Sequence, residues 1–233
     1  GATRCNQGKE SISIDLKSTQ GQKIVHQLAA EADILIHNYR PGVPERLGIG
    51  FEALQRMNPG LIYVSANGYG PAGPGALRPS THPIPGAAMG GALYQAGGAV
   101  NKLLDIDDLR DASRRLMRAN EVNPDPNTSM IICSSSLLGL LARESSGKGQ
   151  QIFVDMFGAN AYANFDDMIH FEGKPPRAGL GESLNGPHPL QSLYETESGW
   201  IFLGISTEAE WEKFCNLIND QMYAQYPSGF PSD

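Results

Sequence analysis

Residues 32–65 read ADILIHNYRPGVPERLGIGFEALQRMNPGLIYVS, and this stretch decides the fold class. It begins and ends with compact apolar runs, Ala32–His37 and Leu61–Ser65, which are typical of buried parallel strands. Between them, Pro44–Asn58 has helical spacing in two pieces that are interrupted at residues 48–50. Because a strand, a helix and a second strand of this kind form a crossover unit, the stretch predicts a parallel sheet.

The same alternation continues on both sides of this unit. Upstream, Ser11–Leu16 alternates apolar and polar residues and predicts a short strand, and Ser18–Glu31 predicts a helix. Downstream, Ser129–Glu144 predicts a long helix and Gln151–Asp155 a further strand. We therefore expect an α/β fold with a mainly parallel, Rossmann-like sheet and crossover helices.

The middle of the chain has a different character. Residues 66–100 hold many of the glycines and prolines and predict a long loop with one small-residue helix, Pro85–Leu93. A loop of this length inside a compact domain is usually functional or a linker. Asp105–Ala119 predicts a charged amphipathic helix.

The C-terminal part of the chain predicts a smaller second unit. Within it, Trp200–Ile205 predicts a strand and Glu208–Ile218 a helix with one apolar face, whereas Gly158–Phe171 predicts a helix that still belongs to the large domain. We expect a large domain over residues 1–184 and the start of a smaller domain over residues 185–233.

Composition bounds the class of protein. The chain has 233 residues, 40% hydrophobic and 18% charged, and no apolar run approaches the length of a membrane span. Its net charge of −7 argues against nucleic acid as the main partner. Cys5, Cys133 and Cys215 are too widely spaced for a disulfide framework or a metal pattern. We expect a cytoplasmic protein without a metal site or a membrane partner.

The sequence DPNTSM at residues 125–130 places one carboxylate at the mouth of the long helix. Because a proline directly after Asp125 suits the first helical position, Asp125 is predicted to be the N-cap, where the helix dipole favours its ionised form. A positioned carboxylate can act as a nucleophile toward an activated acyl group. Ordinary helix capping explains the same pattern, and these residues alone leave both interpretations open.

Several motifs point to one family by their order and spacing. They read NQGKESISIDLK at residues 6–17, ADILIHNYRPG at 32–42, ERLG at 45–48, NPGLIY at 58–63, GYGPAGPG at 68–75 and RESSGKGQ at 143–150. With these motifs the chain resembles the class III CoA-transferases of the carnitine and bile-acid type, which include formyl-CoA transferase and alpha-methylacyl-CoA racemase. The resemblance implies an enzyme that moves coenzyme A from an acyl-CoA to a small carboxylic acid.

The resemblance also carries expectations about size and assembly. Family members are longer and form intertwined dimers, so a homodimer is expected. They begin with a strand-helix-strand unit ahead of the motif at residues 6–9, and we expect this chain to be a central portion of such a protein.

By the same resemblance, Asp125 is the nucleophile that forms an aspartyl-CoA thioester. Gly179 and Gly181 resemble the glycine-rich loop that closes over this intermediate. His82 lies in a loop where family members place a residue facing the active site. The racemase branch has a histidine-aspartate pair there, but the alignment puts Thr81 opposite that histidine, so His82 is either an active-site residue or an ordinary loop residue.

The residues that fall where the family contacts CoA are Asn38, Tyr39, Val43, Arg46 and Leu47, and Lys9 in the first motif is a further cation of the same kind. A cation such as Arg46 can pair with a phosphate, and an aromatic ring such as Tyr39 can pack on the nucleotide. An exposed helix charge and an aromatic at the edge of the core explain the same two residues.

Three functions therefore remain open. The first is a CoA-transferase. The second is an acyl-CoA racemase or epimerase of the same superfamily, which the missing histidine-aspartate pair disfavours. The third is a non-catalytic acyl-CoA-binding half. Nothing in the sequence names the acid or the acyl-CoA.

Overall fold

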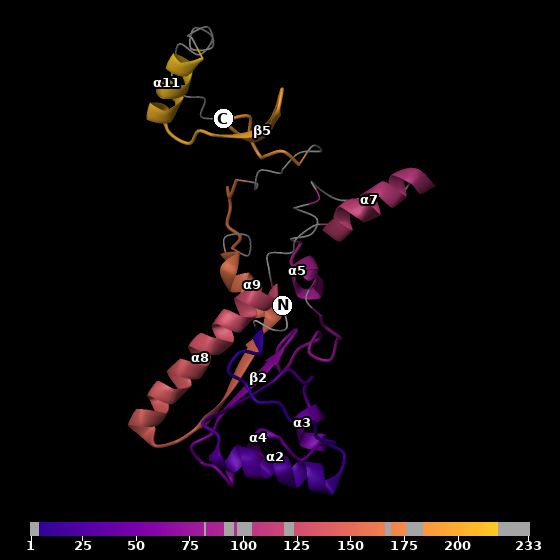
Figure 1. Cartoon of the computed structure of the whole chain (residues 1–233), viewed down its shortest axis with the longest axis vertical. Coiled ribbons are helices and arrows are strands. Elements are labelled where there is room, and N and C mark those ends of the chain that lie inside the picture. The colour runs from indigo at the N-terminus through magenta and orange to yellow at the C-terminus, as the bar shows by residue number, and fades with distance from the viewer. Residues whose placement is uncertain are drawn as a thin grey trace. The chain divides into compact units, whose positions relative to one another are not determined.

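The computed structural model describes residues 5–81, 83–90, 96, 104–118, 124–165, 169–175 and 184–218. The chain divides into two compact units, each made of two separate stretches (Figure 1). Unit 1 comprises Gly1–Met89 and Val122–Met168, and unit 2 comprises Gly90–Glu121 and Ile169–Asp233. The expected domain boundary between residues 184 and 185 stays a prediction.

Unit 1 is built on a three-stranded parallel sheet. Its strands are β1 (Ile34–His37), β2 (Ile62–Asn67) and β3 (Gln150–Asp155), in the order β1-β2-β3. Both pairings are parallel, so the predicted parallel α/β fold is confirmed. Because the strands run in the same direction, their carboxyl ends meet at one edge of the sheet.

Helices cover both faces of this sheet. Figure 1 shows α2 (Thr19–Glu31) and α4 (Phe51–Gln55) on one side and α8 (Pro124–Ser146) on the other. Successive side chains of a strand point to opposite faces, so a central strand with helices on both sides is apolar throughout. The first five residues of β2 are all buried, which explains the compact apolar run in the sequence.

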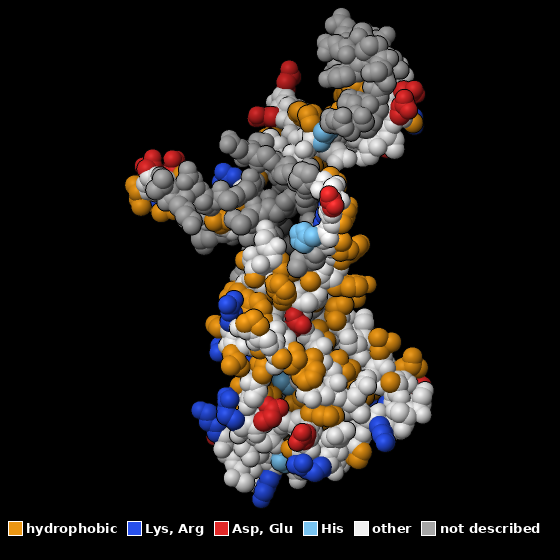
Figure 2. Space-filling model, turned by 180° about the vertical axis from the view of Figure 1, so that it is seen from behind, with side chains coloured by type: hydrophobic (Ala, Val, Ile, Leu, Met, Phe, Trp, Pro, Cys, Tyr) orange, Lys and Arg blue, Asp and Glu red, His pale blue; other side chains and the backbone are white. Residues whose placement is uncertain are grey.

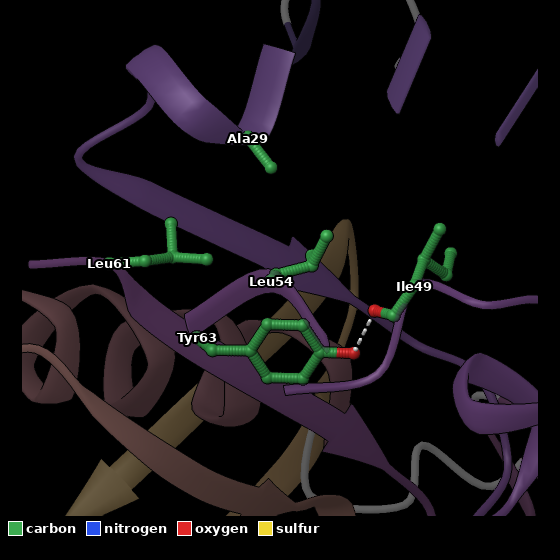
Figure 3. Packing of buried hydrophobic residues seen from close by; sticks show 5 residues of the cluster. All are labelled: Ala29, Ile49, Leu54, Leu61 and Tyr63. Atoms are coloured by element: carbon green, nitrogen blue, oxygen red, sulfur yellow. Dashed lines mark hydrogen bonds between the residues drawn. The ribbon is translucent and has the colours of Figure 1, made fainter. Parts of the chain in front are cut away.

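The core under α2 and α4 is a cluster of buried residues, Ala29, Ile49, Leu54, Leu61 and Tyr63 (Figure 3). Tyr63 is only 1% exposed, and its hydroxyl donates a hydrogen bond of 3.0 Å to the carbonyl oxygen of Ile49. Burial raises the pKa of this hydroxyl well above its usual range, and the nearby carboxylate of Glu45 adds to the effect. The phenol therefore stays protonated and keeps its donor role.

The helix predicted over 44–58 forms as two short helices, α3 (Val43–Arg46) and α4, with a break between them as expected. α3 follows Gly42, whose φ of 79° lies in the left-handed region that glycine adopts without strain. This glycine lets the chain turn sharply from the end of β1 into a helix.

The strand predicted over Ser11–Leu16 is wrong. These residues are irregular and lead into a turn before α2. Ser18 is the N-cap of α2, because its Oγ accepts a hydrogen bond from the Gly21 N–H at 3.0 Å, and its own N–H and hydroxyl donate to the Asp15 carbonyl. Ile14 lies beside Gly21 and Leu16 packs against the core, whereas Ile12 is exposed.

Other boundaries also differ from their predictions: α9 ends at Ala163 rather than Phe171, and α8 begins at Pro124 rather than Ser129. α5 spans Pro83–Ala88, inside the long loop, and α7 spans Ile106–Arg118, close to its prediction. α9 spans Met156–Ala163 and starts two residues before the predicted helix, because Asp155 caps it by accepting the Gly158 N–H at 2.6 Å.

Besides α7, the described part of unit 2 contains an antiparallel hairpin and a further helix. β4 (Gln191–Thr196) pairs with β5 (Gly199–Gly204), and α11 spans Glu208–Leu217. The predicted strand and helix correspond to β5 and α11, whereas β4 was not predicted. Trp211 and Cys215 of α11 are buried in a small core.

Hydrophobic side chains reach the surface in several places (Figure 2). On α8, the exposed large hydrophobic residues are Met130, Leu137, Leu138 and Leu141. Within the described part of the chain, we find no helix with the length and apolar character that a membrane crossing requires.

Candidate active site

The carboxyl-terminal edge of the unit 1 sheet carries two cavities. β1 ends at His37 and continues into the turn 38–42, β2 ends at Asn67, and β3 ends at Asp155. Open α/β sheets bind their ligands in the crevice outside this edge. We name the two cavities after one residue of each wall, the Asp125 cavity and the His37 cavity.

The Asp125 cavity has a volume of about 340 Å³. Its described lining residues are Asn38, Ala66, Asn67, Gly68, Ser80, Asp125, Thr128, Ser129, Ile132 and Met156. Among these residues Asp125 is the one charged side chain, and it lies among hydroxyl and amide groups. The volume is at the low end of the range for small-molecule sites, about 300–1,000 Å³.

Asp125 lies in the first turn of α8 and is not its N-cap, because the helix begins one residue earlier, at Pro124. The prediction of an N-cap is therefore wrong. Prolines at 124 and 126 both fit the first turn, since N–H groups there have no partner within the helix. A negative charge in the first turn is still favoured by the helix dipole. The side chain is exposed, so a ligand in the cavity can reach it.

Two hydroxyl groups beside Asp125 have their hydrogens committed to the helix backbone. Thr128 Oγ1 donates to the Pro124 carbonyl at 2.6 Å, and Ser129 Oγ donates to the Asp125 carbonyl at 2.8 Å. Their oxygen lone pairs, rather than their protons, therefore remain for a ligand. These hydroxyls suit neighbours that donate hydrogen bonds.

The loop after β2 folds back over the strand end and closes one side of the Asp125 cavity. Gly68 lies so close to Ser80 that a Cβ at position 68 would be 2.2 Å from Ser80 Cβ. The Gly68 carbonyl also accepts the Phe157 N–H at 3.0 Å, which ties the loop to α9. Only glycine at position 68 allows this approach, and Ser80 enters the cavity wall as a result.

The His37 cavity has a volume of about 290 Å³. Its described lining residues are His37, Tyr39, Arg40, Pro41, Gly42, Pro44, Glu45, Ser65, Asn67, Pro71, Gln151 and Phe153. Asn67 belongs to both linings, so the two cavities adjoin at the end of β2.

Asn67 has a fixed orientation. Its Oδ1 accepts hydrogen bonds from the N–H groups of Tyr69 at 3.2 Å and Gly70 at 2.7 Å. Because these two donors engage the oxygen, the Nδ2 group is the end of the amide that remains to donate to a ligand. The boundary between the two cavities therefore carries an oriented hydrogen-bond donor.

The structure brings some of the predicted site residues together. Asn38 and Asp125, which are 87 positions apart by their numbers, line the same cavity, and Tyr39 lines the adjoining one. Sequence spacing does not indicate that Asn38 and Asp125 are neighbours, because the turn after β1 and the start of α8 meet only when the sheet forms.

The other predicted residues lie elsewhere or outside the description. Lys9, Val43, Arg46 and Leu47 line neither cavity. Lys9 is exposed and donates to the Cys5 carbonyl at 2.5 Å, and Leu47 packs against the core. His82, Gly179 and Gly181 are outside the described residues.

Among the polar residues of the cavity walls that sequence reasoning missed are His37, Asn67 and Ser80. His37 lines a cavity, and burial lowers its pKa, while the Glu45 carboxylate opposes the shift. The signal that marks His37 and Asn67 is their position as the last residues of parallel strands.

Residues 2–230 match a known family, described as CoA-transferase family III. The chain belongs to this family. It is 31% identical over 152 residues to an acyl-CoA transferase of Fusarium pseudograminearum, covering 65% of this chain and 30% of that protein. It is 25% identical over 250 residues to the formyl-CoA:oxalate CoA-transferase of Afipia carboxidovorans, covering 97% of this chain and 55% of that protein. The chain thus spans about half the length, or less, of such curated relatives.

The fold is shared with solved structures. A CAIB/BAIF family protein from Brucella suis aligns with a TM-score of 0.61 at 24% identity, over 95% of this chain and 55% of that one. Rv3272 of Mycobacterium tuberculosis aligns with a TM-score of 0.61 at 23% identity, over 93% of this chain and 54% of that one. These likenesses support the α/β assignment of the fold.

Proposed function

We propose that this chain carries the catalytic centre of a CoA-transferase that moves CoA from an acyl-CoA to a small carboxylic acid. The observation that carries the proposal is the Asp125 cavity, in which a carboxylate lies at the carboxyl-terminal edge of a parallel sheet beside Asn38. Family membership supports the same assignment, since relatives in the family are named as CoA-transferases acting on different acids.

The proposed reaction divides one acyl exchange into easier steps. An Asp125 carboxylate oxygen attacks the thioester carbonyl of the donor, and the CoA thiolate leaves, giving a mixed anhydride. The thiolate then attacks the aspartyl carbonyl, and the donor acid leaves as a carboxylate. This step produces the aspartyl-CoA thioester.

The second half reverses the first. The acceptor carboxylate attacks the aspartyl carbonyl and displaces the thiolate, and the thiolate then attacks the acceptor's acyl carbonyl. The new acyl-CoA leaves, and the Asp125 carboxylate is restored. To the Asn67 amide, whose oxygen is engaged by the turn and which lines both cavities, we assign the role of a donor to an oxygen that becomes negative in these steps.

We assign CoA to the edge that joins the two cavities. Asn38 and Tyr39 follow β1 into this edge, and Arg40 lines the His37 cavity and supplies a cation for a phosphate. Lys9 and Arg46 remain proposed cations for other phosphates of CoA, a much longer molecule than either cavity. His82, Gly179 and Gly181 remain proposed to act near Asp125. A cytoplasmic homodimer remains our expectation from the family resemblance.

Intact-protein mass spectrometry tests the mechanism. The chain is incubated with a panel of acyl-CoA donors, and the expected product is an adduct with the mass of CoA less one water. The adduct maps to Asp125, disappears with hydroxylamine and is absent from Asp125→Asn. Asp107→Asn is the matched control, because Asp107 is also an exposed carboxylate in the first turn of a helix, α7.

The result also separates the three functions. A wild-type adduct that Asp107→Asn retains and Asp125→Asn loses supports the transferase. Loss of the α-proton of a chiral donor to solvent, without any adduct, would indicate the racemase. CoA binding with neither reaction would indicate a binding half, and Asp125 would then be only a first-turn carboxylate.

A further inference from the structure

The imidazole of His37 joins three parts of unit 1 at the edge that carries both cavities. Its Nδ1 accepts the Tyr39 N–H at 3.2 Å, and its Nε2 lies 3.0 Å from Ser65 Oγ on β2. The ring stacks on Tyr39, with centroids 5.6 Å apart, and meets Tyr63 edge-on at 5.1 Å. One side chain therefore fixes the start of the turn, the aromatic ring of that turn and the neighbouring strand.

The hydrogen bonds assign the tautomer of this histidine. Because Nδ1 accepts a backbone N–H, the proton of the neutral ring is on Nε2, which donates to Ser65 Oγ. A histidine that activates a serine needs a lone pair on the nitrogen facing the hydroxyl. His37 and Ser65 are therefore not a nucleophilic pair, and the imidazole has a holding role instead.

The residue that this arrangement holds is Asn38. The bond from Tyr39 N–H to His37 Nδ1 spans the Asn38 backbone, so it fixes the direction in which the Asn38 side chain leaves the turn. That side chain lines the Asp125 cavity, whereas Tyr39 and His37 line the adjoining one. Asn38 can line one cavity while its neighbours His37 and Tyr39 line the other only if the turn keeps one conformation.

We propose that His37 is a positioning residue for CoA transfer: its neutral imidazole holds the turn so that Asn38 stays in the cavity of Asp125. This inference rests on the proposed function. It gives a role to a histidine that touches neither the thioester nor the nucleophile.

Protonation of His37 would break the arrangement. A proton on Nδ1 would face the Tyr39 N–H, and two donors cannot share that contact. Burial lowers the pKa of His37, and the Glu45 carboxylate on α3 opposes this shift. The other titratable groups around the ring are the phenols of Tyr39 and Tyr63 and the guanidinium of Arg40 in the same cavity wall. The ring is thus neutral at pH 7 and becomes charged only on acidification.

Two substitutions of His37 distinguish the effect of its hydrogen bond from the effect of its ring volume. His37→Phe keeps an aromatic ring but removes the acceptor for Tyr39 N–H, and we expect the rate of CoA-adduct formation on Asp125 to fall about 10- to 100-fold. His37→Asn restores most of the rate, because an asparagine oxygen accepts the N–H two residues on, as in an Asx turn. In wild type the rate falls as the pH drops below the usual histidine value, and His37→Asn loses this dependence since an amide does not titrate.

The chain offers a matched control in unit 2. His188 Nδ1 accepts the Leu190 N–H at 3.1 Å, which is the same contact two residues apart, and His188 lines neither cavity. His188→Phe is expected to leave the rate and its pH profile unchanged. Circular dichroism verifies that each variant is folded, and if His37→Phe does not fold, the pH profile of His37→Asn decides.

The outcomes distinguish this proposal from the proposed function. A wild-type chain that forms no adduct at any pH fails the proposed function, and the role of His37 fails with it. A wild-type adduct with an unchanged rate in His37→Phe, or with the acid loss retained in His37→Asn, overturns the positioning role alone. Long-range ¹H–¹⁵N spectra that place the proton on Nδ1 would overturn it without any activity measurement.

Discussion

Replacing Gly68 with alanine should damage the fold at the Asp125 cavity. The new Cβ would lie 2.2 Å from Ser80 Cβ and 2.4 Å from Ser80 Oγ. Since unbonded carbon atoms normally approach to about 3.5 Å, the Ser80 loop has to move by more than about 1 Å. Overpacking of this kind costs about 1–3 kcal/mol. Gly68 has an ordinary φ, so the cost comes from the collision and not from backbone strain.

A second substitution isolates the collision. With Ser80→Gly, the nearest remaining atom of residue 80 is Cα, 3.7 Å from the new Cβ, which is an ordinary contact. The double variant should therefore recover the 1–3 kcal/mol, and a double-mutant cycle subtracts the separate cost of a glycine at position 80. Gly75→Ala is the matched control in the same loop, since its Cβ would lie 3.4 Å from Tyr69.

The assay has to report on unit 1. Both tryptophans, Trp200 and Trp211, lie in unit 2, so their fluorescence in urea should stay unchanged and acts as an internal control. Hydrogen exchange of peptides from β2 reports the free energy of opening in unit 1. If Gly68→Ala is as stable as Gly75→Ala, or if Ser80→Gly brings no recovery, the close approach of the loop to the strand end is not as described.

Two further predictions concern one hydrogen-bonded side chain in each unit. Tyr63→Phe leaves the Ile49 carbonyl without its donor and should lower the free energy of unfolding of unit 1 by about 1–2 kcal/mol, measured by β2 hydrogen exchange; an unchanged value would mean that water replaces the hydroxyl. Thr207→Ala removes the N-cap of α11, whose capping box pairs Thr207 with Glu210. It should lower the free energy of unfolding of unit 2 by about 1 kcal/mol, measured by tryptophan fluorescence in urea, and leave the hydrogen exchange of β2 unaltered.

The strands and helices of unit 1 could be predicted because their causes are local. The continuous apolar runs at 34–37 and 62–66, and the break near residues 48–50 in a helical period of 3.6 residues, can be recognised from neighbouring residues alone. The prediction failed where a local pattern has two solutions. Ser11–Leu16 has strand-like alternation but is irregular, with Ile14 beside Gly21 at the start of α2.

The end of a helix was another such case. Asp125 is followed by a proline and fits an N-cap, but it is preceded by a proline too, and Pro124 takes the first helical position instead. Both prolines can occupy a first turn, so the sequence does not choose between the two starts. The consequence for the site is small, because a carboxylate in the first turn stays near the positive end of the helix.

The sequence predicted only those residues of the candidate site that belong to recognisable motifs. Asn38, Tyr39 and Asp125 came from resemblance, and the structure brings them to two adjoining cavities. Ser80 could not be found, since its place in the wall depends on the approach of a loop to Gly68. The role of His37 depends on which atom of the ring meets Tyr39 N–H, and sequence spacing contains no such information.

The separation of β2 from β3 along the chain has a consequence for protein synthesis. A ribosome that has released Asn67 has made β1 and β2 but neither α8 nor β3, and β2 pairs with β3 at residues 150–155. At about 5–20 residues per second, the wait for those residues lasts roughly several seconds. During this time Ile62 and Val64 lack the residues of α8 and β3 that cover them, so nascent chains expose this part of the core. The Asp125 cavity can exist only in molecules that have passed through this stage of synthesis.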